Sequence, residues 1–347
     1  MSFRYIGSKA RVVDAILERV GKPNGGMFID AFSGTGAVAV AASNAGWPVL
    51  VNDNLSSSAI MSFARVISEE QVAFTHFAGY ENAISALNEA SPIRGFIHRE
   101  YSPASADHCD VARMYFTEDN ATKIDGVRKV IESWAEKSLV TKLEEKLLIA
   151  DVMGAANRVA NTAGTYGCFL SKWQRQSRDQ FTLTPRALPK LAPPASMSIG
   201  DVSNISCTPD DTVYLDPPYT KRQYAAYYHI LETIALGDEP LVKGVCGIRP
   251  WQEKASDFCY KVRAAKALNN LIQSLPAKRI FLSYSTEGHV AISELENILG
   301  NLGKVETCEL DQIGRYRPNR AASEAGSLVG EILFCLEKRP QKGRAAA

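Results

Sequence analysis

The chain has 347 residues, of which 46% are hydrophobic and 22% charged, a composition that suits one large globular domain or two modest ones. Its formal net charge of +1 gives no global argument for a polyanionic partner, so a nucleic-acid surface requires local clusters of cations. There is no apolar run of the roughly 18 residues that span a membrane, and no Cys-x-x-Cys pair among the seven cysteines. Residues 1–5 lack the apolar region that is typical of a secretory signal. We therefore expect a soluble cytoplasmic protein without a metal site.

The first 54 residues show the start of a doubly wound α/β sheet. Glycines at 34 and 36 turn the first strand into a helix, and the second strand leads into Asn52-Asp53-Asn54. This order of strand, glycine turn, helix, strand and acid is typical of sheets that bind ligands at the carboxyl ends of their strands. The predicted elements are a helix over residues 12–20, a strand over 27–32, a helix over 37–45 and a strand over 48–51.

The alternation of strands and helices is lost from residue 69 to 190, where amphipathic patterns such as residues 141–159 predict helices. We predict an insertion over residues 69–190 in a discontinuous catalytic domain made of residues 1–68 and 191–338, with a disordered tail over 339–347. The α/β pattern resumes with strands over residues 196–201, 212–216 and 279–284, helices over 224–236, 257–274 and 290–300, and an antiparallel pair over 305–310 and 329–337.

Acidic residues and glycines gather where these strands end. In Asp30-Ala31-Phe32-Ser33-Gly34-Thr35-Gly36 the glycines let the backbone approach a ligand closely. Asp53 can accept both ribose hydroxyls of a nucleoside, and Asp201 can accept from an adenine amino group. The alternatives are a tight connection without a ligand and solvated acids at strand ends.

Residues 213–219 predict a buried strand that ends in Asp216-Pro217-Pro218-Tyr219. These residue types suit methylation of the adenine amine. The Asp216 carboxylate and the Pro217 carbonyl can accept its two N–H groups, which frees the nitrogen lone pair for attack on a sulfonium methyl. The prolines stiffen the loop, and the Tyr219 ring can stack on a base flipped out of a duplex. The alternative is a proline-stiffened surface turn.

Together these motifs resemble the DNA adenine-N6 methyltransferases in which Phe-x-Gly-x-Gly precedes Asp-Pro-Pro-Tyr. The resemblance implies an α/β, Rossmann-like S-adenosylmethionine-dependent methyltransferase fold with an inserted, mainly helical target-recognition domain. It also implies S-adenosyl-L-methionine as the cofactor. Residues 4–9 look like the N-terminal motif of the family, which puts Arg4 near DNA. The implied cofactor-binding residues are Tyr5, Lys9, Asp30, Phe32, Gly34, Gly36, Asp53, Asp201 and Asp216, and the implied catalytic residues are Asp216, Pro217, Pro218 and Tyr219.

Two further segments look like the methyltransferases of type II and type IIS restriction systems. They are residues 161–167, followed by Phe169-Leu170, and residues 222–224, followed by residues 228–233. The resemblance implies double-stranded DNA as the substrate and a monomer on DNA, and it allows a cognate restriction endonuclease as a partner. The insertion differs from that of the compact enzymes that read palindromes, so the recognition sequence stays open.

Residues 166–190 hold five cations against the single acid Asp179, interleaved with Trp173, Phe181 and glutamines. The five cations are Lys172, Arg175, Arg178, Arg186 and Lys190. Cations can neutralise phosphates, Arg and Gln can read base edges, and an aromatic ring can wedge into a base stack. A solvated loop is the alternative. The predicted DNA-binding residues are Arg4, Lys172, Trp173, Arg175, Arg178, Lys221 and Arg222, with Arg317 and Arg320 in a second basic loop.

Two other functions remain alternatives. One is methylation of an RNA base amine, which the long segment between the glycine loop and Asp216 disfavours. The other is a DNA-binding subunit without catalysis, which the intact Gly34, Gly36 and Asp216 disfavour. The reaction needs no general base, since the methylated amine can lose its proton after transfer, and we expect His229 to be a packed residue.

Overall fold

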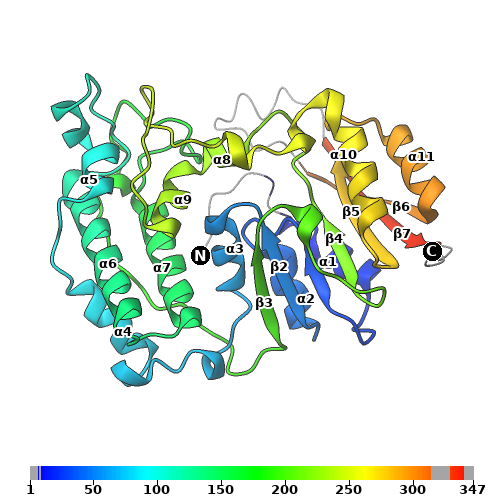
Figure 1. Cartoon of the computed structure of the whole chain (residues 1–347), viewed down its shortest axis with the longest axis horizontal. Coiled ribbons are helices and arrows are strands. Elements are labelled where there is room, and N and C mark those ends of the chain that lie inside the picture. Colours follow the sequence, from blue (N-terminus) through cyan, green and yellow to red (C-terminus); the bar gives the residue numbers. More distant parts are fainter. Residues whose placement is uncertain (1–6, 8, 314–328, 340–347) are drawn as a thin grey trace, which may run out of the picture. The chain divides into compact units, whose positions relative to one another are not determined.

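The computed structural model describes residues 7, 9–313 and 329–339. It is a mixed α/β structure that residue contacts divide into two compact units. The sheet unit comprises Ser8–Asn54, Pro193–Gln223 and Ala255–Ala347, and the helical unit comprises Met1–Gly7, Leu55–Ala192 and Tyr224–Lys254. Figure 1 shows the strands of the first unit and the helix pair α6 and α7 of the second.

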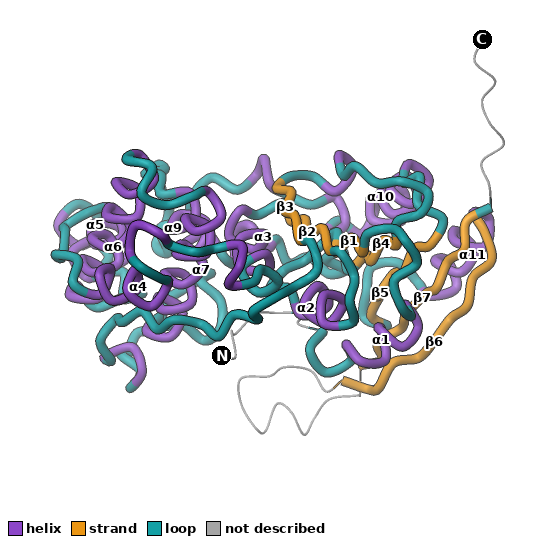
Figure 2. Tube along the Cα trace, turned by 90° about the horizontal axis from the view of Figure 1, so that it is seen from below, coloured by secondary structure: helices purple, strands orange, loops and turns teal. Residues whose placement is uncertain are grey.

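In the sheet unit the described strands form one mostly parallel, seven-stranded sheet in the order β3-β2-β1-β4-β5-β7-β6, which Figure 2 shows in orange. The first five of these strands pair in parallel, and β7 runs antiparallel to both β5 and β6. The strands are β1 (Phe28–Asp30), β2 (Val49–Asp53), β3 (Ala195–Ile199), β4 (Thr212–Leu215), β5 (Arg279–Ser285), β6 (Gly303–Ile313) and β7 (Val329–Lys338).

Helices cover both faces of this sheet, so its central strands are apolar throughout rather than alternating. Ile29 and Val213 belong to a buried cluster shared with α10 and α11. On the other face Phe28 packs against Trp47 and Tyr214, with ring centroids 6.1 and 6.3 Å away. The helices of this unit are α1 (Val13–Val20), α2 (Ala37–Asn44), α10 (Lys261–Ser274) and α11 (Ile292–Leu302), with the short 3₁₀ helices η5 (Val202–Asn204) and η7 (Asp257–Cys259).

The helical unit is built around α7, which begins at a capping box. The Thr141 hydroxyl accepts from the Glu144 N–H at 3.2 Å, and the Glu144 carboxylate accepts from the Thr141 N–H at 2.7 Å. The α-helices are α3 (Ser56–Phe63), α4 (Tyr80–Asn88), α5 (Phe96–Tyr101), α6 (Glu118–Glu136), α7 (Lys142–Val159), α8 (Tyr224–Tyr227) and α9 (His229–Leu236). The 3₁₀ helices are η1 (Glu69–Gln71), η2 (Thr75–Phe77), η3 (Pro103–Asp107), η4 (Gln176–Arg178) and η6 (Gln252–Lys254).

A buried carboxylate joins α9 to α3 within this unit. Glu232 accepts the backbone N–H groups of Ser56 and Ser57 at 3.0 and 2.8 Å, and the Ser57 hydroxyl at 2.8 Å. These N–H groups lie at the start of α3, where no helical carbonyl can accept them. The charge of Glu232 is therefore stabilised by a helix N-terminus.

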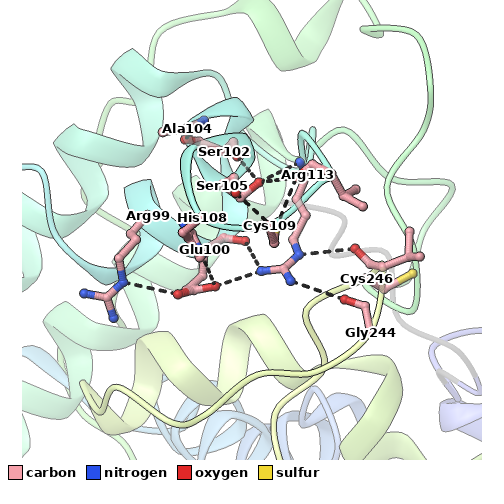
Figure 3. A network of polar contacts seen from close by, with 12 residues as sticks. Arg99, Glu100, Ser102, Ala104, Ser105, His108, Cys109, Arg113, Gly244 and Cys246 are labelled. Atoms are coloured by element: carbon pink, nitrogen blue, oxygen red, sulfur yellow. Dashed lines mark hydrogen bonds and ion pairs between the residues drawn. The ribbon is translucent and has the colours of Figure 1, made fainter.

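A second polar network in the helical unit centres on Arg113 (Figure 3). The guanidinium donates to the Glu100 carboxylate at 2.8 Å and to the carbonyls of Gly244 and Val245 at 3.2 Å each. Glu100 also contacts His108, with Oε2 and Nε2 3.2 Å apart. Arg113 therefore holds a loop from the last segment of the unit against α5.

The structure confirms the mixed α/β class, the predicted alternation and the closing antiparallel strand pair. Two predicted helices differ. Residues 224–236 are interrupted at Tyr228, which has a non-helical backbone (ψ 24°). Residues 257–274 begin as the 3₁₀ helix η7 and continue as α10 only after Tyr260, whose backbone is extended (ψ 116°). The compact units do not follow the predicted domain bounds: Tyr224–Lys254 groups with the helical unit. The division into residues 1–68, 69–190 and 191–338, with a tail over 339–347, stays a prediction. Among the described residues, no helix has both the length and the apolar character needed to cross a membrane.

Candidate active site

The glycine loop between β1 and α2 has the backbone conformation that the sequence predicts. Gly34 and Gly36 have φ values of 51° and 78°, and Gly36 is the N-cap of α2. Side chains would strain both positions, since L-residues rarely adopt this region. Phe32 packs edge-on against Phe258, with ring centroids 5.4 Å apart. At its two glycines the loop therefore presents backbone rather than side chains near the carboxyl end of β1.

The acid at the end of β2 is attached to this loop, whereas the acid after β3 is not. Asp53 Oδ2 accepts the Gly34 N–H at 3.0 Å, and the Asp53 carbonyl accepts the Gly200 N–H at 3.0 Å. Asp201 is exposed, and its carboxylate accepts from the N–H and hydroxyl of Ser203 at 2.8 and 2.5 Å. The structure thus brings Asp53 to the glycine loop and gives Asp201 a contact that caps η5.

Lys9 lies buried between two carboxylates of the sheet unit. Its Nζ is 2.7 Å from Asp216 Oδ1 and 3.2 Å from Glu331 Oε1, and only 5% of the Lys9 side chain is exposed. Burial alone would lower the pKa of Lys9, but the charges of Asp216 and Glu331 outweigh it and hold that pKa well above the usual value. Burial raises the pKa of Asp216, and the Lys9 ammonium opposes this rise. Lys9 therefore stays charged and keeps a cation beside the Asp216 carboxyl.

The rest of the tetrapeptide surrounds this ion pair. The Lys9 ammonium lies 5.5 Å from the centroid of the Tyr219 ring, a cation–π distance. The Tyr219 ring also packs against the Tyr284 ring, with centroids 5.6 Å apart. The backbone carbonyl of Tyr219 accepts the His289 N–H at 2.9 Å. Pro217 is buried and Pro218 is half-buried. The loop after β4 is therefore held at several points, which leaves its acceptors little freedom to move.

Several buried polar atoms near the sheet edge at which the parallel strands end accept or donate no hydrogen bond within the described part of the chain. They are Asp30 Oδ1, Ser33 Oγ, Asn52 Oδ1 and Glu331 Oε1, the last within ion-pair distance of Lys9. Buried polar groups without partners are costly, so a cluster of them indicates a place where a polar ligand binds. These residues therefore fit a nucleoside-type ligand. No group of three or more His, Cys, Asp or Glu among residues 9–313 and 329–339 could hold a metal ion.

Asp30 is protonated at neutral pH. It is 2% exposed, and burial together with the charge of Asp216 raises its pKa to about 8. Its Oδ2 accepts the Ala39 N–H of α2 at 3.1 Å, which only partly offsets these effects. The cluster at the ends of the strands therefore carries less negative charge than its number of carboxyl groups suggests.

We expect Asp30→Asn to stabilise the protein at pH 8 and to flatten the pH dependence of its stability. In the unfolded chain Asp30 loses its proton near pH 4, whereas its pKa in the folded protein is about 8. Between pH 4 and pH 8 the free energy of unfolding therefore falls by roughly 1.4 kcal/mol for each unit that the pH rises. Asn keeps an acceptor for the Ala39 N–H and cannot ionise. Thermal unfolding between pH 4 and 9 measures this slope. Equal slopes in both proteins would contradict the assignment, and the exposed Asp110→Asn serves as the control.

In the helical unit, residues around η4 present exposed cations. Lys172, Arg175 and Arg178 are exposed, and none of them forms an ion pair with any residue that the structure describes. Trp173 is half-buried. The Asn161 side chain fixes this loop, because it accepts the Gln174 N–H at 3.0 Å and donates to the Leu170 carbonyl at 2.9 Å. The cations are thus displayed on a segment with defined backbone hydrogen bonds.

Two residues expected to face DNA lie elsewhere. Phe181 is 1% exposed and packs inside the helical unit, so its ring cannot wedge between bases. Arg186 forms an ion pair with Asp151 of α7 at 2.7 Å, so its guanidinium serves a buried carboxylate. His229 is a packed residue, as expected: it is fully buried beside the Tyr166 carbonyl, and burial lowers its pKa to about 4.

The remaining predicted site residues fall into two groups. Lys221 and Arg222 are exposed and follow the tetrapeptide after Thr220 in the sheet unit. Arg4, Tyr5, Arg317 and Arg320 lie outside the described residues.

The glycine loop and the tetrapeptide both lie in the part of the chain that matches a known protein family. Residues 5–298 match the family model described as D12 class N6 adenine-specific DNA methyltransferase. The chain belongs to this family.

Similar curated proteins carry names of the same kind. Type II methyltransferase M.FokI of Planomicrobium okeanokoites is 32% identical over 345 residues, which cover 96% of this chain and 52% of that protein. Modification methylase StsI of Streptococcus sanguinis is 29% identical over 97% of this chain and 52% of that protein. Type II methyltransferase M.NlaIII of Neisseria lactamica is 29% identical over 96% of this chain and 99% of that protein. The chain thus spans about half the length of the first two relatives and nearly all of the third.

The sequence motifs did not identify three residues of the site, Ser33, Asn52 and Glu331. Ser33 and Asn52 lie inside the recognised segments but carry no motif of their own. Glu331 lies 115 positions after Asp216 in β7, beyond every motif. A signal was present in β7, because an acid interrupts the apolar run Val329-Gly330-Glu331-Ile332-Leu333-Phe334.

Proposed function

We propose that this chain is a site-specific DNA methyltransferase that transfers a methyl group from S-adenosyl-L-methionine to the N6 amine of adenine in duplex DNA. The observation that carries the proposal is the buried Lys9–Asp216 ion pair within the Asp-Pro-Pro-Tyr loop. This loop follows β4, and the glycine loop follows β1, which is paired with β4 in parallel. A carboxylate acceptor and a ligand-binding turn therefore lie at the ends of neighbouring strands.

We assign the cofactor to the glycine loop of a Rossmann-like methyltransferase fold. Gly34 and Gly36 allow close backbone approach, and Asp53 is the acid that would accept the ribose hydroxyls. Ser33 Oγ and Asn52 Oδ1, which have no hydrogen-bond partner among the described residues, add polar groups that such a ligand can satisfy. Bound S-adenosyl-L-methionine supplies an electrophilic methyl group on a sulfonium.

Asp216 would bind and activate the adenine amine. Lys9 donates to Oδ1 of Asp216, so Oδ2 is the oxygen outside this ion pair. Oδ2 can accept one N–H of the amine, while the Pro217 carbonyl accepts the other. Two acceptors draw the nitrogen towards tetrahedral geometry and free its lone pair. Tyr219 offers its ring to the base, which must leave the duplex to reach these acceptors. The extra proton leaves the methylated amine after transfer.

We assign DNA recognition to the helical unit as an inserted target-recognition region. Lys172, Arg175 and Arg178 can neutralise phosphates, and Trp173 can contact a base. The names of the relatives, type II methyltransferases, support a restriction-modification context. Within that context we propose a cognate endonuclease as a partner and a monomer as the form that acts on DNA. Nothing in this assignment fixes a recognition sequence.

The double variant Lys172→Ala/Arg175→Ala should bind DNA more weakly, with a slope of log K against log salt that is smaller by about 2. Each lost phosphate contact removes about one released counterion. Fluorescence anisotropy with duplex DNA at several salt concentrations measures the slope. Lys137→Ala/Lys142→Ala, which removes two exposed cations of the same unit, is the charge-matched control. An unchanged slope in the first variant would remove this segment from the DNA interface.

Expression in a host without DNA methylation tests the substrate. Single-molecule sequencing of the host DNA should show N6-methyladenine in one sequence context. The Asp216→Ala variant should leave that DNA unmodified. Marks on RNA alone, or no adenine mark on DNA, would reject the proposed function.

A further inference from the structure

Glu331 is a buried carboxylate of β7 that no sequence motif includes. Its strand neighbours Ile332 and Phe334 face the core shared with α10 and α11. Glu331 is 5% exposed and lies opposite Ser285 of β5. Burial of an acid in this position is costly unless a cation compensates it, and the cation present is Lys9.

The two carboxylates hold Lys9 unequally. Asp216 Oδ1 lies 2.7 Å from Nζ, whereas Glu331 Oε1 lies 3.2 Å away and accepts no hydrogen bond from a described residue. The Lys9 ammonium thus forms ion pairs with two carboxylates. With Asp216 and Glu331 ionised and Lys9 charged, these three residues together carry one net negative charge.

We propose that Glu331 is a positioning residue for methyl transfer, which holds Lys9 beside Asp216 and leaves the cluster with one net negative charge. This inference rests on the proposed function. As the amine attacks, the N–CH₃ bond forms while the S–CH₃ bond breaks, so the sulfonium leaves as a neutral thioether and the positive charge moves to the amine nitrogen next to Asp216. The extra proton of the methylated amine passes to solvent afterwards. A net negative cluster stabilises the positive charge on the nitrogen, and a neutral Lys9–Asp216 pair does so less well. Sharing Lys9 also leaves Asp216 a stronger hydrogen-bond acceptor.

Several charged and titratable groups surround this cluster. Burial raises the pKa of Glu331, Lys9 opposes this rise, and the charge of Asp216 adds to it. Loss of the Glu331 charge therefore removes a repulsion and lowers the pKa of Asp216. The other groups that face the cluster are Asp30 of β1, Tyr214 of β4 and Tyr219 of the following loop. Behind them, Asp53 of β2 acts on Asp30, and Arg222 and Tyr284 of β5 lie beside Tyr219.

Glu331→Gln tests the proposal, because it keeps the size of the side chain and removes only its charge. We expect the single-turnover rate of methyl transfer to fall by about 10- to 100-fold, and the affinities for DNA and S-adenosyl-L-methionine to stay within about threefold. The acidic limb of the pH–rate profile should move to lower pH. Glu331→Asp, which restores the charge, should recover most of the rate. Glu337→Gln, an exposed acid of the same strand, is the matched control.

A second readout does not depend on activity. Lys9→Met leaves two buried carboxylates without their cation, so Glu331→Gln should raise the melting temperature in that background and leave it equal or lower in the wild-type background. A shift of the same sign and size in both backgrounds would mean that Glu331 does not act through Lys9. A Glu331→Gln enzyme with the wild-type rate and pH profile would overturn the inference. The proposed function fails separately, if the wild-type protein methylates no adenine in DNA.

Discussion

Asp216→Ala should lower the single-turnover rate of methyl transfer by about a thousandfold or more while S-adenosyl-L-methionine still binds. The substitution removes the acceptor that activates the amine. It also leaves the Lys9 ammonium with Glu331 alone, at the place where a positive charge develops. The residues assigned to the cofactor above, Gly34, Gly36 and Asp53, lie in the loop after β1 and at the end of β2, outside this ion pair. Rapid-quench assays and titration calorimetry measure the two quantities.

The exposed acid Asp210 provides a control close in sequence. Its only ion pair among the described residues is a long one of 3.7 Å with Lys278, so Asp210→Ala should leave the rate unchanged. Residual transfer by Asp216→Ala within about tenfold of the wild type would contradict the role of Asp216. Loss of cofactor binding in this variant would instead place Asp216 in the cofactor site.

Arg113→Ala should destabilise the helical unit by about 3–5 kcal/mol, the cost of breaking a buried ion pair. The Arg113 and Glu100 side chains are 6% and 11% exposed, so truncation leaves a buried carboxylate without this partner. The carbonyls of Gly244 and Val245 lose their donor at the same time. Urea unfolding followed by circular dichroism measures the change in the free energy of unfolding.

Arg99 gives a matched control on the same carboxylate. Its guanidinium contacts Glu100 at 3.2 Å, but the side chain is 51% exposed, so solvent screens the pair. Arg99→Ala should cost no more than about 1 kcal/mol. If both substitutions cost the same, the network around Arg113 does not hold its loop in the way the structure indicates.

Local sequence patterns predicted the sheet and the position of the tetrapeptide well, because each depends on short segments. The glycine turn requires positive φ at Gly34 and Gly36, and only glycine adopts it readily. The apolar runs of β1, β4 and β5 match strands that are buried on both faces. Asp53 and Asp216 follow from these elements, since parallel strands place their carboxyl ends on one side.

Long-range contacts could not be predicted in the same way. The segment around η4 is basic along its whole length. Even so, Lys172 is exposed, whereas Arg186 forms an ion pair with the buried Asp151. Charge counts do not separate such residues, because burial depends on a helix that lies earlier in the chain. The partnership of Glu331 with Lys9 joins the two ends of the sequence across the sheet, and no local pattern specifies it.

Methyl transfer to duplex DNA by the purified chain tests the central claim most directly. The protein is incubated with unmethylated duplex DNA and S-adenosyl-L-methionine carrying a labelled methyl group, and the digested nucleosides are separated by mass. We predict label in N6-methyl-2′-deoxyadenosine from DNA, its absence with Asp216→Ala, and far less label in RNA of the same sequence. Label in cytosine, label only in RNA, or equal labelling by Asp216→Ala would contradict the account.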